Sequence, residues 1–173
     1  HPRDPAWFAK RYNMDIKTGH EVISVDHPNR TMTVVDLATG TEFTDTYDTL
    51  VLATGARSII PPLPGVEAPG VFTVRNVQNA EAIRAWILTH KAKTAVVVGS
   101  GFIGLEMAEQ LTEAGLQVAI VERLPQVMPA LDADMAFRVQ EELLRHSVAV
   151  HLARSVTAID ANDDTVTGVQ LDN

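Results

Sequence analysis

The chain has 173 residues, 46% of them hydrophobic and 21% charged, which is enough apolar material for a folded core. A formal net charge of −8 argues against binding to the phosphate backbone of a nucleic acid. The sequence contains no cysteine, so disulfides, thiolate metal sites and a cysteine nucleophile are excluded within it. No apolar run reaches the roughly 18 residues of a membrane span and no signal peptide is visible, so we expect a cytoplasmic protein with no membrane partner.

The first third of the sequence predicts one short helix and then antiparallel strands. Residues 4–13 favour a helix because Asp4 can cap its start and Pro5 suits its first turn. Short β-branched segments separated by turn residues then indicate a meander. These predicted strands cover residues 21–25, 31–35 and 41–44, and a continuous apolar run at 49–53 predicts a buried strand that ends at Thr54-Gly55.

The remainder of the chain has a different pattern. Residues 57–70 are rich in proline and glycine and predict a stiff linker. After them strands and helices alternate, which is typical of a parallel sheet with helical crossovers. The predicted helices cover 79–89, 102–114 and 134–146, the strands 94–98, 117–121 and 148–152, and a final hairpin 156–159 and 166–171. Because the sequence opens at His1 without an initiator methionine and stops at Asn173 within this hairpin pattern, we expect a fragment of a longer protein.

A glycine-rich motif joins the strand at 94–98 to the helix that follows it. A GxGxxG pattern in this context predicts a dinucleotide site of the Rossmann type. The first glycine permits the tight turn, the second lets the pyrophosphate approach the backbone, and the third lets the helix pack closely. The helix N-terminus then offers N–H groups to the phosphates. We therefore expect NAD(P)H to bind at Gly99, Ser100, Gly101, Phe102, Ile103 and Gly104.

An acidic residue follows the next predicted strand, as this type of site requires. Glu122 lies 18 positions beyond Gly104, close to the spacing of about 20 that is usual for the ribose-binding acid. Its carboxylate can accept both ribose hydroxyl protons and would repel a 2′-phosphate, which favours NADH. The neighbouring Arg123 could tolerate that phosphate, so NADPH stays an alternative. The histidines form no HxxxH pair, and we expect no metal site.

Several motifs in this order resemble the FAD-dependent pyridine nucleotide–disulfide oxidoreductases, and most closely their coenzyme A-disulfide reductase and NADH oxidase branch. The resemblance covers nearly the whole chain. It is carried by Leu50-Val51-Leu52-Ala53-Thr54-Gly55-Ala56, by Gly99 to Glu106, by Val121-Glu122-Arg123 and by Met128-Pro129-Ala130-Leu131-Asp132.

The resemblance assigns roles to residues that the patterns alone leave open. Ala53, Thr54 and Gly55 would contact FAD, and Val22 occupies the position whose backbone contacts the adenine. Phe102 occupies the position of an aromatic residue that covers the flavin. Glu106 resembles an acidic residue near the contact of nicotinamide with flavin, and its alternative is a solvated glutamate in the first helical turn that complements the helix dipole.

The resemblance also implies a domain division and a reaction. Residues 1–60 would be part of an FAD-binding domain, and residues 65–173 an incomplete NAD(P)H-binding domain. The family's first FAD-binding glycine motif, its redox cysteine and its C-terminal interface domain are absent from this sequence. The parent enzyme, expected to be a homodimer, would transfer a hydride from NAD(P)H to FAD and pass electrons to a disulfide, persulfide or oxygen.

Three expectations remain open beside that reaction. A ferredoxin- or rubredoxin-reductase type of flavoprotein shares both dinucleotide motifs and needs no cysteine. A nucleotide-binding module without catalysis is the alternative from a different class. For the chain by itself, we expect weak binding of NADH and little or no binding of FAD.

Overall fold

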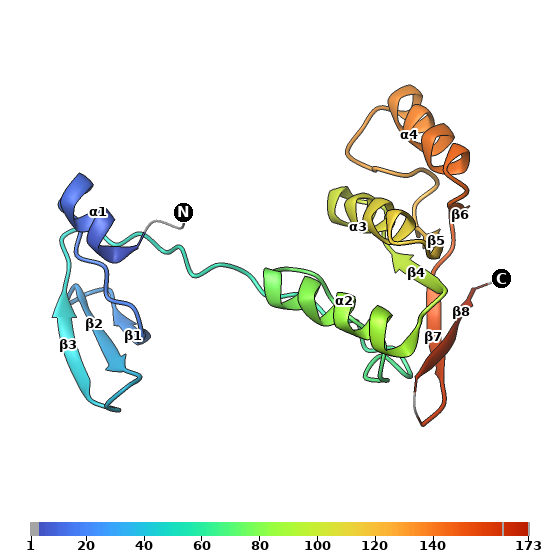
Figure 1. Ribbon diagram of the computed structural model, residues 1–173. Coiled ribbons are helices and arrows are strands. Elements are labelled where there is room, and N and C mark those ends of the chain that lie inside the picture. The colour runs from blue at the N-terminus through green and yellow to red at the C-terminus, as the bar shows by residue number, and fades with distance from the viewer. Residues whose placement is uncertain (1–3, 164, 173) are drawn as a thin grey trace. The chain divides into compact units, whose positions relative to one another are not determined.

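The computed structural model describes residues 4–163 and 165–172, so the terminal residues His1 and Asn173, from which a fragment was predicted, lie outside it. The chain divides into two compact units, His1–Gly55 and Ala56–Asn173, and each is described by itself (Figure 1). Among the described residues no helix is long and apolar enough to cross a membrane.

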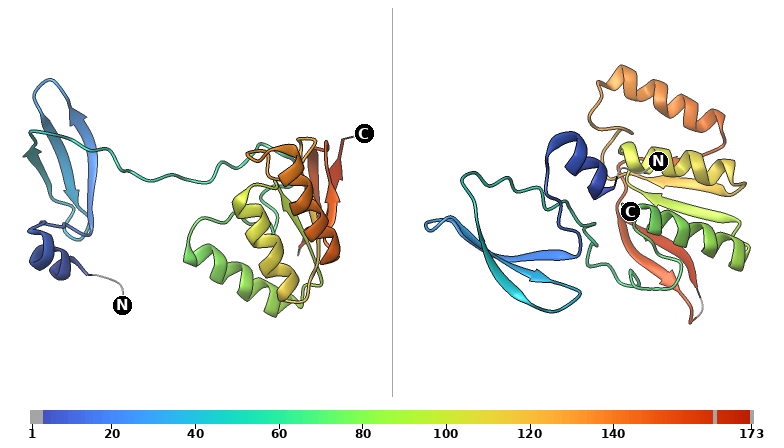
Figure 2. Two further views of the ribbon diagram at one scale, coloured as in Figure 1. Left: turned by 90° about the horizontal axis from the view of Figure 1, so that it is seen from above. Right: turned by 60° about the vertical axis from the view of Figure 1, so that its left-hand side comes forward.

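The first unit consists of one helix and a three-stranded antiparallel sheet (Figure 2, left). Helix α1 spans Pro5–Tyr12, and the Asp4 side chain caps it by accepting a hydrogen bond from the backbone N–H of Trp7 at 2.7 Å. The strands are β1 (His20–Asp26), β2 (Thr31–Asp36) and β3 (Glu42–Thr46), in that order across the sheet. The predicted helix and meander are therefore confirmed.

The buried strand predicted over Thr49–Ala53 is absent. Residues 51–63 form no helix or strand, and the side chains of Val51 and Leu52 are 80% and 73% exposed. An apolar run becomes a buried strand only where neighbouring strands supply its hydrogen bonds and cover its faces. None of the described strands pairs with this segment, so its composition alone does not make it a strand.

The second unit is built on a parallel sheet with the order β4-β5-β6, as the alternating pattern predicted. Helix α3 connects β4 to β5 and α4 lies between β5 and β6, and α3 packs on β4 and β5 (Figure 1). The elements are α2 (Val77–His90), β4 (Thr94–Val98), α3 (Phe102–Glu113), β5 (Gln117–Val121), α4 (Ala133–Arg145) and β6 (Ala149–His151).

The hydrophobic core of this unit lies between the sheet and its helices. Ile120 at the centre of β5 is completely buried, as is Ala108 on the inner face of α3. Ile83 and Ile87 of α2 pack against the same cluster. The edge strand β4 differs from the prediction of a buried strand, because Val96 and Val98 on it are 42% and 60% exposed.

The proline-rich segment is part of the second unit and not a free linker. The carbonyl groups of Pro64 and Pro69 accept hydrogen bonds of 2.8 Å from the backbone N–H groups of Ile159 and Val166. These residues belong to the antiparallel hairpin of β7 (Val156–Ala161) and β8 (Val166–Leu171), which the sequence predicted. Gly65 has a φ of +79°, and a Cβ there would lie 2.1 Å from the carbonyl oxygen of Ile159. Proline and glycine therefore serve a close backbone contact here.

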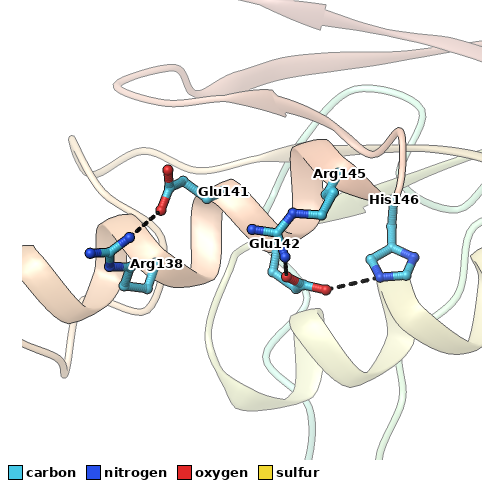
Figure 3. Close-up of polar contacts among 5 residues, drawn as sticks. All are labelled: Arg138, Glu141, Glu142, Arg145 and His146. Carbon is cyan, nitrogen blue, oxygen red and sulfur yellow. Dashed lines mark hydrogen bonds and ion pairs between the residues drawn. The ribbon is translucent and has the colours of Figure 1, made fainter.

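Charged side chains on the exposed face of α4 form ion pairs along the helix (Figure 3). Arg138 pairs with Glu141 at 3.0 Å, and Glu142 contacts both Arg145 and, at 3.0 Å, His146. Exposed pairs at this spacing stabilise a helix by about 0.2–0.5 kcal/mol each. They explain the stability of a polar helix face and do not form a ligand site.

Candidate dinucleotide-binding site

The register of the parallel sheet brings the glycine-rich turn next to Glu122. Val98 at the end of β4 is paired with Val121 at the end of β5, and the Gly99 N–H donates to the Val121 carbonyl at 2.8 Å. The residues that follow these two strands therefore emerge at one edge of the sheet. This carboxyl edge is where ligands bind in open α/β sheets.

The three glycines of the motif have different surroundings. Gly99 has a φ of +98°, which residues with side chains rarely adopt, so the turn out of β4 requires it. A Cβ on Gly104 would lie 2.0 Å from the carbonyl oxygen of Gly99, so only glycine lets α3 start this close to the turn. A Cβ on Gly101 would meet no atom within 4 Å. The backbone at Gly101 is thus open to an approaching group.

Helix α3 begins at this open backbone. Gly101 is its N-cap and has no side chain with which to cap it, while its carbonyl accepts the first helical hydrogen bond, from the N–H of Leu105, at 3.0 Å. The first N–H groups of a helix have no partner within the helix and carry partial positive charge. Phe102 and Ile103 in this first turn are 69% and 63% exposed. The helix start therefore offers an anion-binding end bordered by two apolar side chains.

Glu122 is buried beside the turn and is held by three hydrogen bonds. Glu122 is only 8% exposed, and Ser100 beside it is completely buried. Both the backbone N–H and the Oγ of Ser100 donate to Glu122 Oε2 at 2.8 Å. The N–H of Leu124 donates to Glu122 Oε1 at 2.9 Å. The carboxylate thus joins the glycine-rich turn to the loop after β5.

The surroundings of Glu122 favour its ionised form. Burial acts to raise the pKa of this carboxyl group, but hydrogen bonds from the N–H of Leu124 and from the N–H and hydroxyl of Ser100, with a further one from the N–H of Arg123, hold it below the usual value. A buried carboxylate with this many donors stays charged at neutral pH. Negative charge is consequently fixed at the carboxyl edge of the sheet.

The loop after β5 is fastened to the same turn at a second point. The Ser100 carbonyl accepts a hydrogen bond from the Met128 N–H at 3.0 Å. Val127 and Met128 are buried, with exposures of 0% and 4%, although they lie in a loop. Sequence reasoning placed Ser100 in the motif but missed its contacts with Glu122 and Met128. The only signal in the sequence is the hydroxyl residue between Gly99 and Gly101, which could have indicated a hydrogen bond to a neighbouring group.

The other predicted NAD(P)H-site residues are exposed. Arg123 is exposed, although it follows the buried Glu122 directly. Glu106 is also exposed on α3, and the first turn of that helix contains no acidic residue. The alternative interpretation of Glu106 is therefore right that the residue is solvated and wrong that it lies in the first turn, and its role near the flavin stays a prediction.

The residues predicted to contact FAD all belong to the first unit. Val22 is 51% exposed and pairs with Val34 of β2 at a point where the register of β1 shifts. Ala53, Thr54 and Gly55 lie in the exposed segment after the sheet, and Gly55 has a φ of +76°. All four residues are exposed, and within the described part of the first unit they do not line a pocket. Their contact with FAD stays a prediction.

Comparison with known proteins places these features in a family. A family model described as pyridine nucleotide-disulphide oxidoreductase matches residues 8–173. An NADH oxidase of Methanocaldococcus jannaschii is 44% identical over 156 residues, which is 90% of this chain and 35% of that protein. A coenzyme A disulfide reductase of Staphylococcus aureus is 32% identical over 93% of this chain and 36% of its own length. The chain thus spans about a third of these relatives.

Solved structures agree with these relatives. An NAD-dependent persulfide reductase from A. fulgidus has a TM-score of 0.86 and 38% identity over 98% of this chain and 31% of its own. A ferredoxin reductase from Rhodopseudomonas palustris has a TM-score of 0.83 and 31% identity over 97% of this chain and 40% of its own. An engineered water-forming NADPH oxidase bound to NADPH has a TM-score of 0.78 and 29% identity over 91% and 35%.

These matches cover both units and include the glycine-rich turn, α3 and Glu122. The predicted resemblance and fold class are confirmed, and the chain belongs to the pyridine nucleotide-disulphide oxidoreductase family.

Proposed function

We propose that this chain supplies the NAD(P)H-binding site and part of the FAD-binding site of a flavin-dependent oxidoreductase. The observation that carries the proposal is the carboxyl edge of the parallel sheet, where the open backbone at Gly101, the start of α3 and the ionised Glu122 lie together. Each recognises a different part of a dinucleotide, which is more than a chance glycine turn would provide.

Different residues at this edge would bind different parts of the dinucleotide. The N–H groups at the start of α3 would hold the pyrophosphate, and the missing Cβ at Gly101 leaves room for it. Glu122 would accept a hydrogen bond from the adenosine ribose. Phe102, which is exposed at the helix start, would be the aromatic residue that covers the flavin, and the exposed Ile103 would border the bound NAD(P)H beside it.

Glu122 supports NADH as the preferred donor, because its charge would repel a 2′-phosphate. The engineered NADPH oxidase differs from its NADH oxidase parent by replacement of a glycine, of an aspartate 18 positions later, of the two residues after that aspartate, and of a proline. This chain has Gly104, Glu122, Arg123, Leu124 and Pro129 at the same spacing. It keeps an acid where the engineered protein lost one, and of the two arginines that the engineered protein gained it has only the first, at Arg123, with Pro129 at the position of the second.

The first unit and the exposed residues of α3 complete the proposal. Val22 and the small residues Ala53, Thr54 and Gly55 would contact FAD, and their exposed backbone leaves space for it. When bound, FAD would accept the hydride and release electrons to the final acceptor. Glu106 would lie near the contact of nicotinamide with flavin. On this assignment residues 1–60 belong to an FAD-binding domain and residues 65–173 to an NAD(P)H-binding domain.

For the final acceptor we propose a small disulfide, a persulfide or oxygen, and for the whole protein a cytoplasmic homodimer. The named activities of the NADH oxidase, the coenzyme A disulfide reductase and the persulfide reductase support this acceptor class. A ferredoxin-reductase activity is the second candidate, because the ferredoxin reductase from Rhodopseudomonas palustris matches 97% of this chain.

Anaerobic titration of the purified whole protein with NADH, followed in the visible spectrum, tests the proposal, because the cysteine-free chain 1–173 cannot itself supply a thiolate. A long-wavelength charge-transfer band would show a thiolate against the flavin and would support the disulfide, persulfide and oxygen class. Bleaching of the flavin without that band would favour the ferredoxin-reductase candidate. Binding of NADH by a protein with no flavin would leave a nucleotide-binding module and contradict the proposed oxidoreductase.

Isothermal titration of the chain 1–173 tests the division of labour between the units. We expect measurable affinity for NADH and little for FAD, because the NAD(P)H edge is formed within the second unit whereas Ala53, Thr54 and Gly55 lie in an open segment. Stoichiometric retention of FAD by this chain would contradict that expectation.

A further inference from the structure

We infer that Ser100 is a positioning residue, whose hydroxyl fixes the Glu122 carboxylate for the adenosine ribose and thereby sets the preference for NADH over NADPH. This inference rests on the proposed function, because it takes the carboxyl edge of the sheet to be a dinucleotide site.

The geometry around Ser100 is that of a side chain built to hold another. Its Oγ lies 2.8 Å from Glu122 Oε2, and its own N–H donates to the same oxygen at the same distance. A glutamate at the end of a strand has three rotatable side-chain bonds, and its freedom would place the carboxylate anywhere around the ribose pocket. Two donors on Oε2, with Leu124 N–H on Oε1, leave it one orientation.

Counting acceptor positions shows what this orientation offers to a ligand. A carboxylate has about four acceptor positions, two on each oxygen. Ser100 fills both positions on Oε2, the Leu124 N–H donates to Oε1, and the Arg123 N–H adds a further bond to the carboxylate. A ribose hydroxyl would therefore bind on the Oε1 side, next to backbone N–H donors, whereas the sequence suggested that Glu122 accepts both ribose hydroxyls. The fixed charge then faces the ribose from one side, and it cannot turn away from a 2′-phosphate.

The hydroxyl can be removed without removing the other attachments of the turn. The Ser100 N–H keeps its bond to Glu122, and the Ser100 carbonyl keeps its bond to Met128 N–H. A matched control exists on the same helix–strand unit. Thr112 Oγ1, partly buried on α3, donates to the Ala108 carbonyl at 2.7 Å and has no contact with Glu122. Thr112→Val therefore deletes a hydrogen-bonded hydroxyl outside the proposed site, although this hydroxyl is less buried than that of Ser100.

The test measures binding of two redox-inactive probes, ADP-ribose and its 2′-phosphorylated form, to the purified protein by calorimetry. Wild type is expected to prefer ADP-ribose. Ser100→Ala is expected to lower that affinity by roughly tenfold, the size of one lost hydrogen bond to a charged group, and to weaken 2′-phospho-ADP-ribose less or strengthen it. The preference between the probes therefore narrows, while Thr112→Val leaves it unchanged.

Two further measurements separate positioning from general stability. In a Glu122→Gln background, Ser100→Ala should produce no further change in the preference, because it acts through the carboxylate. In wild-type Glu122, removal of one donor should move the loss of ADP-ribose affinity at acidic pH to a higher pH. Thermal melting of every variant identifies any that is unfolded at the temperature of the titration.

The outcomes decide between distinct cases. An unchanged preference in Ser100→Ala overturns the inference, and so does an equal loss of affinity for both probes, which would make the hydroxyl structural. An equal effect of Ser100→Ala with and without Glu122 also overturns it. If wild type binds neither probe, the proposed function itself fails, and that result is visible before any variant is compared.

Discussion

The glycine-rich turn of the second unit and the Ala53-Thr54-Gly55 turn of the first both carry the family resemblance, but only the glycine-rich turn has its supporting elements around it. Around the glycine-rich turn, β4, α3 and β5 follow one another in the chain. Hydrogen bonds join Gly99 to Val121 and Ser100 to Glu122. Before the Ala53-Thr54-Gly55 turn, the apolar residues Val51 and Leu52 form no strand and are exposed.

The difference is one of sequence distance between interacting parts. A strand–turn–helix–strand unit of about 30 residues contains its own sheet partner and its own helix, so its backbone and side-chain groups can be satisfied locally. A central strand needs partners on both sides, and none of the described strands serves residues 49–53. A motif therefore specifies a site only where the elements that support it are also present.

The largest expected effect contrasts a buried apolar residue of β5 with an exposed one from the irregular segment. In the chain 1–173, Ile120→Ala should lower the free energy of unfolding by about 2–5 kcal/mol because it opens a cavity in the core. Leu52→Ala should change it by less than about 0.5 kcal/mol. Urea unfolding followed by circular dichroism measures both. A comparable loss in Leu52→Ala would show that residues 49–53 pack in solution and would break the comparison.

A second contrast tests whether the proline-rich segment is structural. Gly65 and Gly40 have similar φ values, +79° and +73°, but a Cβ collides with the Ile159 carbonyl at the first and meets nothing at the second. Gly40→Ala should cost about 1 kcal/mol for the backbone conformation alone. Gly65→Ala should cost about 2–4 kcal/mol because overpacking adds to it. Trp7 lies in the first unit with Gly40 and Trp86 in the second with Gly65, so the fluorescence of each, with the other replaced by phenylalanine, reports the unfolding of its own unit. Equal costs would mean that the segment detaches from the β7–β8 hairpin.

A third prediction concerns pH and the Glu122 network. Because its folded pKa is lowered, Glu122 contributes stability that is fully present above the pKa of an unfolded glutamate and is lost as the pH falls through the lower folded value. Ser100→Ala should therefore be less stable than wild type at neutral pH, by about 1–2 kcal/mol, and the difference should shrink in acid. Denaturant melts at several pH values measure it. A difference that is constant with pH would show that the hydroxyl does not act on the carboxylate.

The smallest effect is expected at Glu106. Glu106→Gln changes an exposed residue of α3 outside its first turn, so the free energy of unfolding should move by less than about 0.5 kcal/mol. If Glu106 lies near the contact of nicotinamide with flavin, as proposed, the rate of flavin reduction by NADH should fall while NADH affinity stays the same. Stopped-flow absorbance measures that rate. An unchanged rate would remove Glu106 from the proposed site and leave the glycine-rich edge as it is.

Elements with their own local signals could be predicted from the sequence. Strands β4 and β5 have the predicted bounds, α3 begins at the predicted Phe102, and Asp4 caps α1. The spacing of Glu122 from Gly104 also identified a residue that the structure places beside the turn. In each case the signal and the structure it predicts lie within a few residues or one strand–helix repeat.

Features that depend on distant partners could not be predicted. Composition marked residues 57–70 as a linker, but hydrogen bonds to Ile159 and Val166, almost a hundred positions away, make part of it a structural segment. The exposure of Val96 and Val98 depends on which neighbours the edge strand β4 has. The hydrogen bonds from Ser100 to the Glu122 carboxylate could not be predicted either. The GxGxxG motif allows any residue at position 100, so only the side-chain geometry reveals them.

The double attachment of the loop after β5 has a consequence for protein engineering. Ser100 binds Glu122, where the loop begins, and through its carbonyl it binds Met128, near the far end. The backbone between these two points forms a short loop that hydrogen bonds hold at both ends. Val127 within it is buried, whereas Arg123 and Leu124 are exposed. We expect such a loop to keep its position when its exposed residues are exchanged. Substitutions at Arg123 and Leu124 would then adapt it to a different nucleotide, provided that the hydrogen bonds of Ser100 to Glu122 and Met128 are kept.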